Sequence, residues 1–341
     1  PKDFQEILEQ GDIQKIIAVF DVCDVNAVGG YGKQTAIAFD KCPDEVARWL
    51  FDNGIDLSIK DTWGSSALHN RARSRRSDVR TLLEIGSDIK AVDDCGNTPL
   101  HSAANSQNAS NAKTLIEFGA TVDEANKEGL TPLELGLRGC GNIDIEDMVD
   151  FAQVLLDSGA KKSKNTKKFV EEIGQRFEFH RENFNKDSVE DVSKALEQLY
   201  SLFDVIPIQR RQKHDGKSPI VVKASSWQKQ HEELWGLLVP SSGHASTVQG
   251  ELIRVSGRIS NEIEGNGGTN WDTDFSKMAE AFIQMLTLGE ALSTKEITEA
   301  TSIVKSIKNS TEGSDRLAQL AVIWVKKNST PLPLEKTGYK R

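Results

Sequence analysis

No stretch of this sequence is long and apolar enough to cross a membrane. The longest candidate, residues 317–325, ends at Lys326, whereas a membrane-spanning helix needs about 18 apolar residues. The first four residues also lack the basic and apolar regions of a secretory signal. We therefore expect a chain that is neither inserted in a membrane nor secreted.

Cysteine is scarce, with four residues in 341: Cys23, Cys42, Cys95 and Cys140. Their spacings of 19, 53 and 45 residues match no zinc or redox motif, and a disulfide framework would be denser. We interpret all four as buried thiols of a reducing compartment. The predicted location is the cytoplasm.

An excess of positive charge is also absent. The chain has 42 Lys and Arg against 51 Asp and Glu, a net charge of −9. Binding to nucleic-acid phosphates needs a clustered positive surface, and docking on anionic lipid needs basic segments. We expect neither nucleic acid nor membrane as a partner.

A catalytic constellation is missing as well. The turn at residues 265–268 lacks the Gly-Lys-Ser/Thr of a phosphate loop. After His231, the position of a second zinc-binding histidine is taken by Trp235. Asp272 and Asp274 come without the further ligands that a hard cation needs. No cofactor and no metal is therefore predicted.

What the sequence does contain is an internal repeat. A Gly-x-x-x-Leu segment recurs at residues 64–68, 96–100 and 129–133, with spacings of 32 and 33. A second signal runs in phase with the first, an apolar segment closed by Gly54, Gly86, Gly119 and Gly159. Two independent signals at one period predict a solenoid of stacked units.

Residues 98–103 read Thr-Pro-Leu-His-Ser-Ala, and with this signature the segment of about residues 4–160 resembles the ankyrin repeat. Pro99 and Pro132 suit a first helical position, where no N–H is needed, and the threonine before each can cap that turn. His69 and His101 fill the histidine position of the signature, whose side chain braces turns. We count four and a half to five repeats, the first a degenerate cap. The resemblance implies binding to another protein.

The repeat signal ends near residue 162, so we predict two domains, 1–162 and 163–341. The second contains apolar residues at helical spacing in segments of about 165–183, 188–203, 226–239, 247–263, 272–288, 293–308 and 315–327. Residues 331–333 are expected to form a loose tail. The predicted fold class is all-α, an ankyrin-repeat solenoid followed by a helical-bundle domain. Residues 234–272 resemble an uncharacterised bacterial domain, which implies a bacterial origin and no established activity.

In ankyrin stacks, the tips of the β-turn fingers and the first helices form the binding wall. The residues at the corresponding positions of this chain, which we expect to form its binding wall, are Thr62, Trp63, Ser65, Arg73, Asp94, Cys95, Asn97, Asn105, Lys127, Glu128 and Leu130. Trp63 is the strongest candidate, because large aromatic residues concentrate binding energy. The alternative is that Trp63 packs against a neighbouring finger or the second domain.

A run of arginines lies in the same region. Residues 71–80 hold five arginines and one aspartate, a net charge of +4, while the rest of the chain carries −13. Arg71, Arg73, Arg75 and Arg76 are therefore further candidates for contact with an acidic partner or with the acidic second domain. A merely solvated run is the alternative.

In the second domain, four charged residues spaced three or four apart share one helix face: Glu251, Arg254, Arg258 and Glu262. One interpretation is a solvated ladder of ion pairs. The other is a half-buried network that also includes Gln249, Asn266 and Asp272 and orients a partner.

These observations predict a non-catalytic protein that binds another protein. The most concrete form is a bacterial immunity-type protein that holds a toxin or effector inactive. The second class is an enzyme in residues 165–330 with the repeats as substrate adaptor, in which Glu251, Arg254, Arg258 and Asp272 converge on a pocket. A third class, nucleic-acid binding through the arginine run, conflicts with the acidic total.

Overall fold

The computed structural model describes residues 3–307 and 312–341, and its regular secondary structure is almost all helical. In these ranges the regular strands are β1 (Val28–Gly29) and β2 (Gln34–Thr35), which pair antiparallel with Val28 opposite Thr35. The chain divides into two compact units, unit 1 with residues up to Phe177 and Phe184–Ile208, and unit 2 with Glu178–Asn183 and Gln209–Arg341. Within the described residues, no helix combines the length and the apolarity that crossing a bilayer requires.

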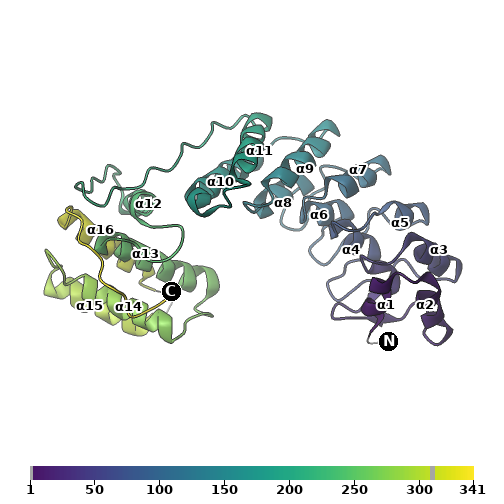
Figure 1. Ribbon diagram of the computed structural model, residues 1–341, viewed down its shortest axis with the longest axis horizontal. Helices are drawn as coiled ribbons and strands as arrows, with labels where there is room; N and C mark the ends of the chain where they lie inside the picture. The colour runs from purple at the N-terminus through teal and green to yellow at the C-terminus, as the bar shows by residue number, and fades with distance from the viewer. Residues whose placement is uncertain (1–2, 308–311) are drawn as a thin grey trace. The chain divides into compact units, whose positions relative to one another are not determined.

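Unit 1 is built from short helices that mostly follow one another as pairs, while α3 is preceded by a 3-10 turn, η2 (Ala36–Ala38), instead of a first α-helix (Figure 1). They are α1 (Phe4–Gln10), α2 (Ile13–Ala18), α3 (Asp44–Asp52), α4 (Ala67–Arg73), α5 (Arg80–Glu84), α6 (Pro99–Ala104), α7 (Ala109–Glu117), α8 (Pro132–Gly139) and α9 (Ile145–Asp157). First helices pack on first helices, α4 on α6 and α6 on α8, while the second helix α7 packs on α9. This is the stacked arrangement that the period predicts, because one pair cannot bury its own apolar face.

The helix ends follow from the sequence as expected. Thr98 and Thr131 are the N-cap residues of α6 and α8, with a proline at the next position. The second helices end before Gly86, Gly119 and Gly159, whose φ angles of +97°, +97° and +92° are left-handed. Glycine adopts this conformation without steric cost, so the prediction of ankyrin-type units is confirmed.

Two further helices belong to unit 1. These are α10 (Lys164–His180), whose last residues pass into unit 2, and α11 (Val189–Leu202), which packs on α9. Their buried residues Val170, Phe177 and Leu199 belong to the same apolar core as the repeats. The compact unit therefore reaches Ile208, beyond the domain boundary that we predicted at residue 162 from the end of the repeat signal.

Unit 2 is a bundle of α12 (Trp227–Leu238), α13 (Val248–Ser260), α14 (Thr273–Met285), α15 (Thr294–Ser306) and α16 (Ser314–Lys327). All five lie within the predicted helical segments or one residue from them, except that the predicted end at Lys308 lies outside the described residues. Helix α13 is central and packs on α12, α14 and α16. A five-residue π-helical turn, η4 (Asn261–Gly265), continues it.

The segment after α16 is ordered against α13, so the expectation of a loose tail is wrong. The Val248 N–H donates to the Leu332 carbonyl at 2.8 Å, and the Leu334 N–H donates to the Ser246 carbonyl at 3.1 Å. The buried amide of Gln249 contacts this segment as well, because its Oε1 accepts from the Leu332 N–H at 3.0 Å. Near the end of the segment, the Tyr339 side chain is 4% exposed.

Candidate functional site

The finger tips of unit 1 are shaped by one acidic or amide residue each. Asp61 Oδ1 accepts hydrogen bonds from the N–H groups of Trp63 and Ser65, both at 2.9 Å. Asp93 and Asn126 make the same pair of bonds one and two repeats later. An Asx side chain that binds the backbone ahead of it fixes a tight turn. The residues just after it are therefore held at the tip.

Successive fingers are joined edge to edge by backbone hydrogen bonds. The Thr62 N–H donates to the Gly32 carbonyl at 2.9 Å, the Asp94 N–H to the Trp63 carbonyl at 3.1 Å, and the Lys127 N–H to the Cys95 carbonyl at 3.0 Å. The tips thus form one continuous edge. We call its exposed side chains the finger surface: Tyr31, Thr62, Trp63, Asp94, Cys95, Lys127 and Glu128.

Trp63 lies on this surface with 52% of its area exposed. Its ring lies against Gly32 of the preceding finger, where an added methyl group would come within 2.7 Å of the indole. Tyr31, which is 93% exposed, lies beside it with 6.0 Å between ring centroids. One face of Trp63 thus packs on the neighbouring finger, as the alternative interpretation expects, while the rest of the side chain faces solvent. We missed Tyr31, because its repeat has lost the signature residues.

The arginine run divides into three groups. Arg71 is 3% exposed, and its guanidinium donates to the carbonyls of Cys42 and Asp78 at 2.9 and 3.2 Å. It lies inside the solenoid rather than on a binding surface, because it satisfies carbonyl groups of the neighbouring loops. Arg75 and Arg80 are exposed but held in ion pairs with Asp144, Asp147 and Glu117 at 2.9 to 3.0 Å.

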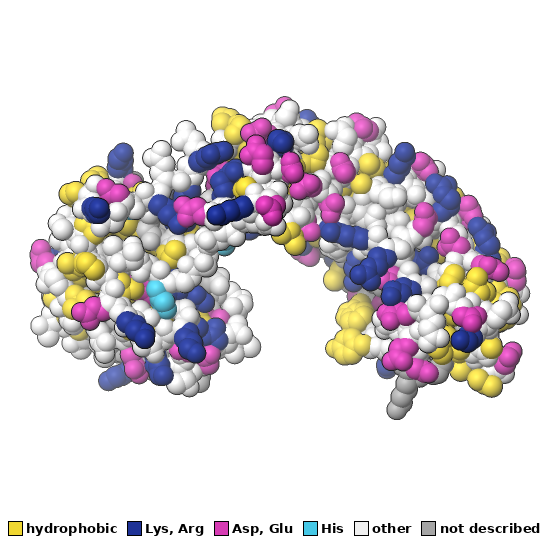
Figure 2. Space-filling view, viewed as in Figure 1, with side chains coloured by type: hydrophobic (Ala, Val, Ile, Leu, Met, Phe, Trp, Pro, Cys, Tyr) yellow, Lys and Arg dark blue, Asp and Glu magenta, His cyan; other side chains and the backbone are white. Residues whose placement is uncertain are grey.

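Arg73 and Arg76 form the third group. Both are exposed, and neither guanidinium makes a hydrogen bond or ion pair with a described residue. These are the arginines whose charge is available to a partner. On the face of unit 1 shown in Figure 2, basic and hydrophobic side chains lie next to one another.

The remaining predicted wall positions also separate by burial. Asn105 is exposed and Asn97 is half-buried, whereas Ser65 and Leu130 are buried. Ser65 and Leu130 are not on the surface, because each follows the tip and turns back toward its first helix. The prediction of four buried thiols is right for Cys42 and Cys140, whose pKa values burial raises to about 12. It is wrong for the exposed Cys95 and the half-buried Cys23.

The two signature histidines have a structural role. His69 and His101 are fully buried. Each Nδ1 accepts from a capping N–H, and each Nε2 lies 2.9 to 3.0 Å from a carbonyl of the next finger, that of Asn97 or Leu130. Burial lowers the pKa of both rings. They hold consecutive repeats in register, as the resemblance implies.

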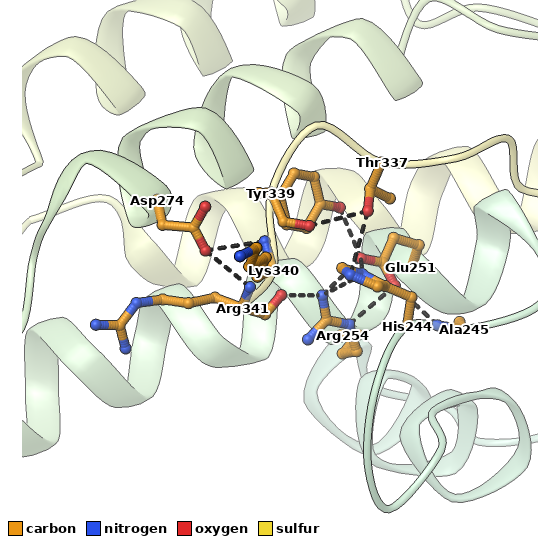
Figure 3. A network of polar contacts seen from close by, with 9 residues as sticks. All are labelled: His244, Ala245, Glu251, Arg254, Asp274, Thr337, Tyr339, Lys340 and Arg341. Atoms are coloured by element: carbon orange, nitrogen blue, oxygen red, sulfur yellow. Dashed lines mark hydrogen bonds and ion pairs between the residues drawn. The ribbon is translucent and has the colours of Figure 1, made fainter.

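In unit 2, Glu251 and Arg254 of the predicted helix face belong to a buried network (Figure 3). Glu251, which has no exposed surface, accepts from Arg254 Nε at 2.8 Å and Nη2 at 2.6 Å. Tyr339 donates to the same carboxylate at 2.6 Å, and His244 Nδ1 lies 3.0 Å from it. Burial alone would raise the pKa of Glu251, but Arg254 and these donors lower it to about 2. A solvated ladder is therefore excluded for this pair.

The other predicted residues of unit 2 have different surroundings. Glu262 accepts from the side chains of Asn266 and Asn270 at 3.0 and 3.2 Å. Asp272 caps α14 and pairs with the Arg341 guanidinium at 2.7 Å, which lowers the pKa of this carboxyl to about 2. Gln249 faces the other way, toward residues 328–332. Arg254 and Arg258 line a common cavity with Arg341. Arg341 could not be found from the sequence, because it lies far from α13 along the chain.

Comparison with known proteins agrees with the repeat geometry. The family model described as ankyrin repeats (three copies) matches residues 34–120 and 68–166. These segments contain the fingers at residues 61–65, 93–97 and 126–130 and lie within unit 1. No curated protein matches the chain. The chain thus carries ankyrin repeats, and repeats of this class mediate binding to other proteins.

Proposed function

We propose that this ankyrin-repeat chain binds a partner protein through its finger surface, with Trp63 and Tyr31 as the anchor. The observation that carries the proposal is the pair of adjacent, exposed aromatic rings at the edge of the fingers. Exposed aromatic residues of this size are enriched among those that dominate binding energy at interfaces. The Trp63 ring is also held on one side by Gly32, so little side-chain freedom is lost on binding.

The charge of the same repeat suggests the chemistry of the partner. Arg73 and Arg76 carry exposed guanidinium groups without a carboxylate partner among the described residues, on a chain whose net charge is −9. Complementary charge sets orientation and association rate more than affinity. We therefore propose a partner whose surface combines an apolar pocket for the aromatic pair with an acidic patch for the arginines.

In its most concrete form, the proposal is a bacterial immunity-type protein that acts in the cytoplasm and holds a toxin or effector inactive. Its support is the combination of a partner-binding repeat unit with an acidic chain, together with the association of ankyrin proteins with secreted toxins. This last step is associational, since a fold hosts many functions. Co-expression with toxins encoded beside the gene tests it. Restored growth supports this role, and unchanged toxicity with every neighbouring toxin contradicts it.

An enzyme in unit 2, with the repeats as substrate adaptor, is the second candidate. The observation that favours it is that Arg254, Arg258 and Arg341 line one cavity. Glu251 and Asp272 do not line that cavity, and each is bound to one of these arginines. The four residues thus converge only in part, and binding remains the preferred function.

The test of the finger surface is a pull-down in which the intact chain is compared with Trp63→Ala plus Arg73→Glu. Loss of a truncated aromatic anchor costs about 2 kcal/mol or more, so a specific partner should bind at least about thirtyfold more weakly. The matched control is Ile206→Ala plus Arg210→Glu, which changes an apolar residue that is even more exposed, at 87%, and an exposed arginine, both outside the fingers. A partner that both variants retain would contradict the proposal.

A further inference from the structure

Unit 2 contains a cavity of about 810 Å³ that the proposed function does not use. It lies between α12, α13 and the turn η4, and its other walls come from the end of α10, the loop at residues 239–243, residues 266–270, the start of α14 and Arg341. Sites for small molecules typically occupy about 300 to 1,000 Å³ and combine apolar walls with a few polar groups. The size fits a ligand with a ring and one or two substituents.

Arg258 is the arginine of this cavity that has no counter-charge from a described residue bound to it. Its side chain is half-buried in the wall of the cavity, and it makes no hydrogen bond or ion pair with a described residue. Burial, followed by the nearby charges of Arg254 and Arg341, lowers the pKa of its guanidinium. Removing a cation from water without a counter-charge is unfavourable, so an anion in the cavity would be stabilised by this residue.

The two neighbouring arginines are already fixed in place. Arg254 is bound on two nitrogens by Glu251 and donates through Nη2 to the Arg341 carbonyl at 2.7 Å. The Arg341 guanidinium pairs with Asp272 and lies over the Phe275 ring, 4.8 Å from its centroid. Figure 3 shows the contacts that Arg254 of α13 makes with Glu251 and with the Arg341 carbonyl. Their rotamers are held before a ligand arrives, which lowers the entropic cost of binding.

The carboxylates of the cavity do not neutralise Arg258. Two glutamates line it, Glu232 and Glu262, against three arginines. Glu262 is occupied by hydrogen bonds from Asn266 and from the side chain and N–H of Asn270, while Glu232 is exposed. Because Glu251 and Asp272 already pair with Arg254 and Arg341, Arg258 is the arginine of the lining that has no carboxylate of a described residue bound to it.

Three aromatic side chains, Phe179, His231 and Trp235, also line the cavity. Trp235 lies against the Gly257 backbone, where an added methyl group would come within 2.4 Å of the indole. Phe179 stacks on the same indole with an interplanar angle of 21°. His231 is held by Ser256 at 2.9 Å, and burial lowers its pKa, so the ring is neutral near pH 7. A planar ligand ring would pack beside these rings rather than between them, because Gly257 and Phe179 already lie against the Trp235 indole and Arg211 lies over the Phe179 ring, 4.3 Å from its centroid.

The backbone beside the cavity is also unusual. Helix α13 continues into a π-helical turn at residues 261–265, and Asn261 and Glu262 of this turn line the cavity. Single π-helical turns are rare and occur frequently at functional sites. This observation is independent of the arginines.

We propose that this cavity binds a phosphomonoester of a planar heterocycle, of the size of a nucleoside monophosphate, with Arg258 as the phosphate-binding residue. A phosphomonoester carries a charge of about −1.5 to −2 at pH 7 and three acceptor oxygens. It thus matches a cluster of guanidinium groups better than a single carboxylate does. The heterocycle packs beside the aromatic side chains. This site is separate from the finger surface, so either proposal can fail without the other.

The test is isothermal titration calorimetry of the full chain with AMP, GMP, CMP and UMP. At least one should bind with a Kd below about 1 mM, and its nucleoside should bind at least tenfold more weakly. Arg258→Gln should weaken the nucleotide at least tenfold, and Arg258→Lys, which keeps the charge but not the planar fork, should fall in between.

The matched control is Arg210→Gln, an exposed arginine of unit 2 that does not line the cavity. This variant should bind as the intact chain does, and circular dichroism and melting temperature should be the same for all variants. The proposal is overturned if none of the four nucleotides binds, if nucleosides bind as tightly as nucleotides, or if Arg258→Gln leaves binding unchanged.

Discussion

Mild acid is expected to destabilise the ankyrin repeats through two buried histidines. In His69 and His101, Nδ1 faces a backbone N–H that can only donate, that of Ser66 at 3.2 Å or Thr98 at 3.1 Å. Nδ1 must therefore be the unprotonated nitrogen, and Nε2 donates to the carbonyl of the next finger. A proton added to either ring would break the capping bond and place a charge in the core.

The direction and the size of this change in stability follow from the pKa values of the two histidines. Burial lowers the pKa of both rings below the ordinary value of 6.5. Below pH 6.5 the unfolded chain binds protons that the folded chain does not, so stability falls as the pH falls. Each ring contributes about 1.4 kcal/mol per pH unit between its unfolded and folded pKa values. Between pH 7.5 and pH 5.5, the two rings together should lower the free energy of unfolding by up to about 3 kcal/mol.

The assay is urea denaturation of the full chain at pH 7.5 and 5.5, with hydrogen exchange of peptides from residues 60–135 as the readout. The control is His69→Gln plus His101→Gln, because a glutamine amide can accept and donate like the neutral ring but does not titrate. The free energy of unfolding of this variant should depend much less on pH. Equal losses in the variant and the intact chain would refute the reasoning.

Two further predictions concern stability. Gly64→Ala should lower the free energy of unfolding by about 2 kcal/mol, because φ is +74° and the new methyl group would lie 2.4 Å from Asp94 Oδ1. Gly129→Ala, where φ is +77° but the space is open, should lower it by only about 1 kcal/mol. Equal losses for the two variants in urea titrations would contradict the close approach of the fingers. Arg254→Met should destabilise unit 2 by about 3 to 5 kcal/mol, because it leaves the carboxylate of Glu251 buried without its cation; a melting temperature within 2 °C or so of the intact chain would contradict this.

Much of the fold of unit 1 could be predicted because its determinants are local. The capping threonines, the prolines after them and the closing glycines each act within one helix turn, and their period is visible in the sequence. The exposed position of Trp63 follows from the same register. The extent of the unit could not be predicted in this way, since α10 and α11 join its core through apolar residues that carry no repeat signature.

The side chains that the sequence misplaced depend on contacts between distant segments. Five arginines in ten residues look alike, and only the packing of the first helix shows that Arg71 points at the Cys42 carbonyl while Arg73 faces solvent. In unit 2 the spacing of Glu251 and Arg254 predicts a pair but not its burial. The network that encloses the pair includes Tyr339, which lies 88 residues from Glu251 in the chain.

Photo-crosslinking at the finger surface tests the central claim most directly. Tyr31, at 93% exposure, would be replaced by p-benzoyl-phenylalanine in the full chain, and Ile206, at 87%, would be replaced in a matched control. On irradiation in the source cells, position 31 should give one specific protein adduct that is lost when Trp63→Ala is added, and position 206 should give none. An adduct at position 206 and none at position 31 would contradict the account.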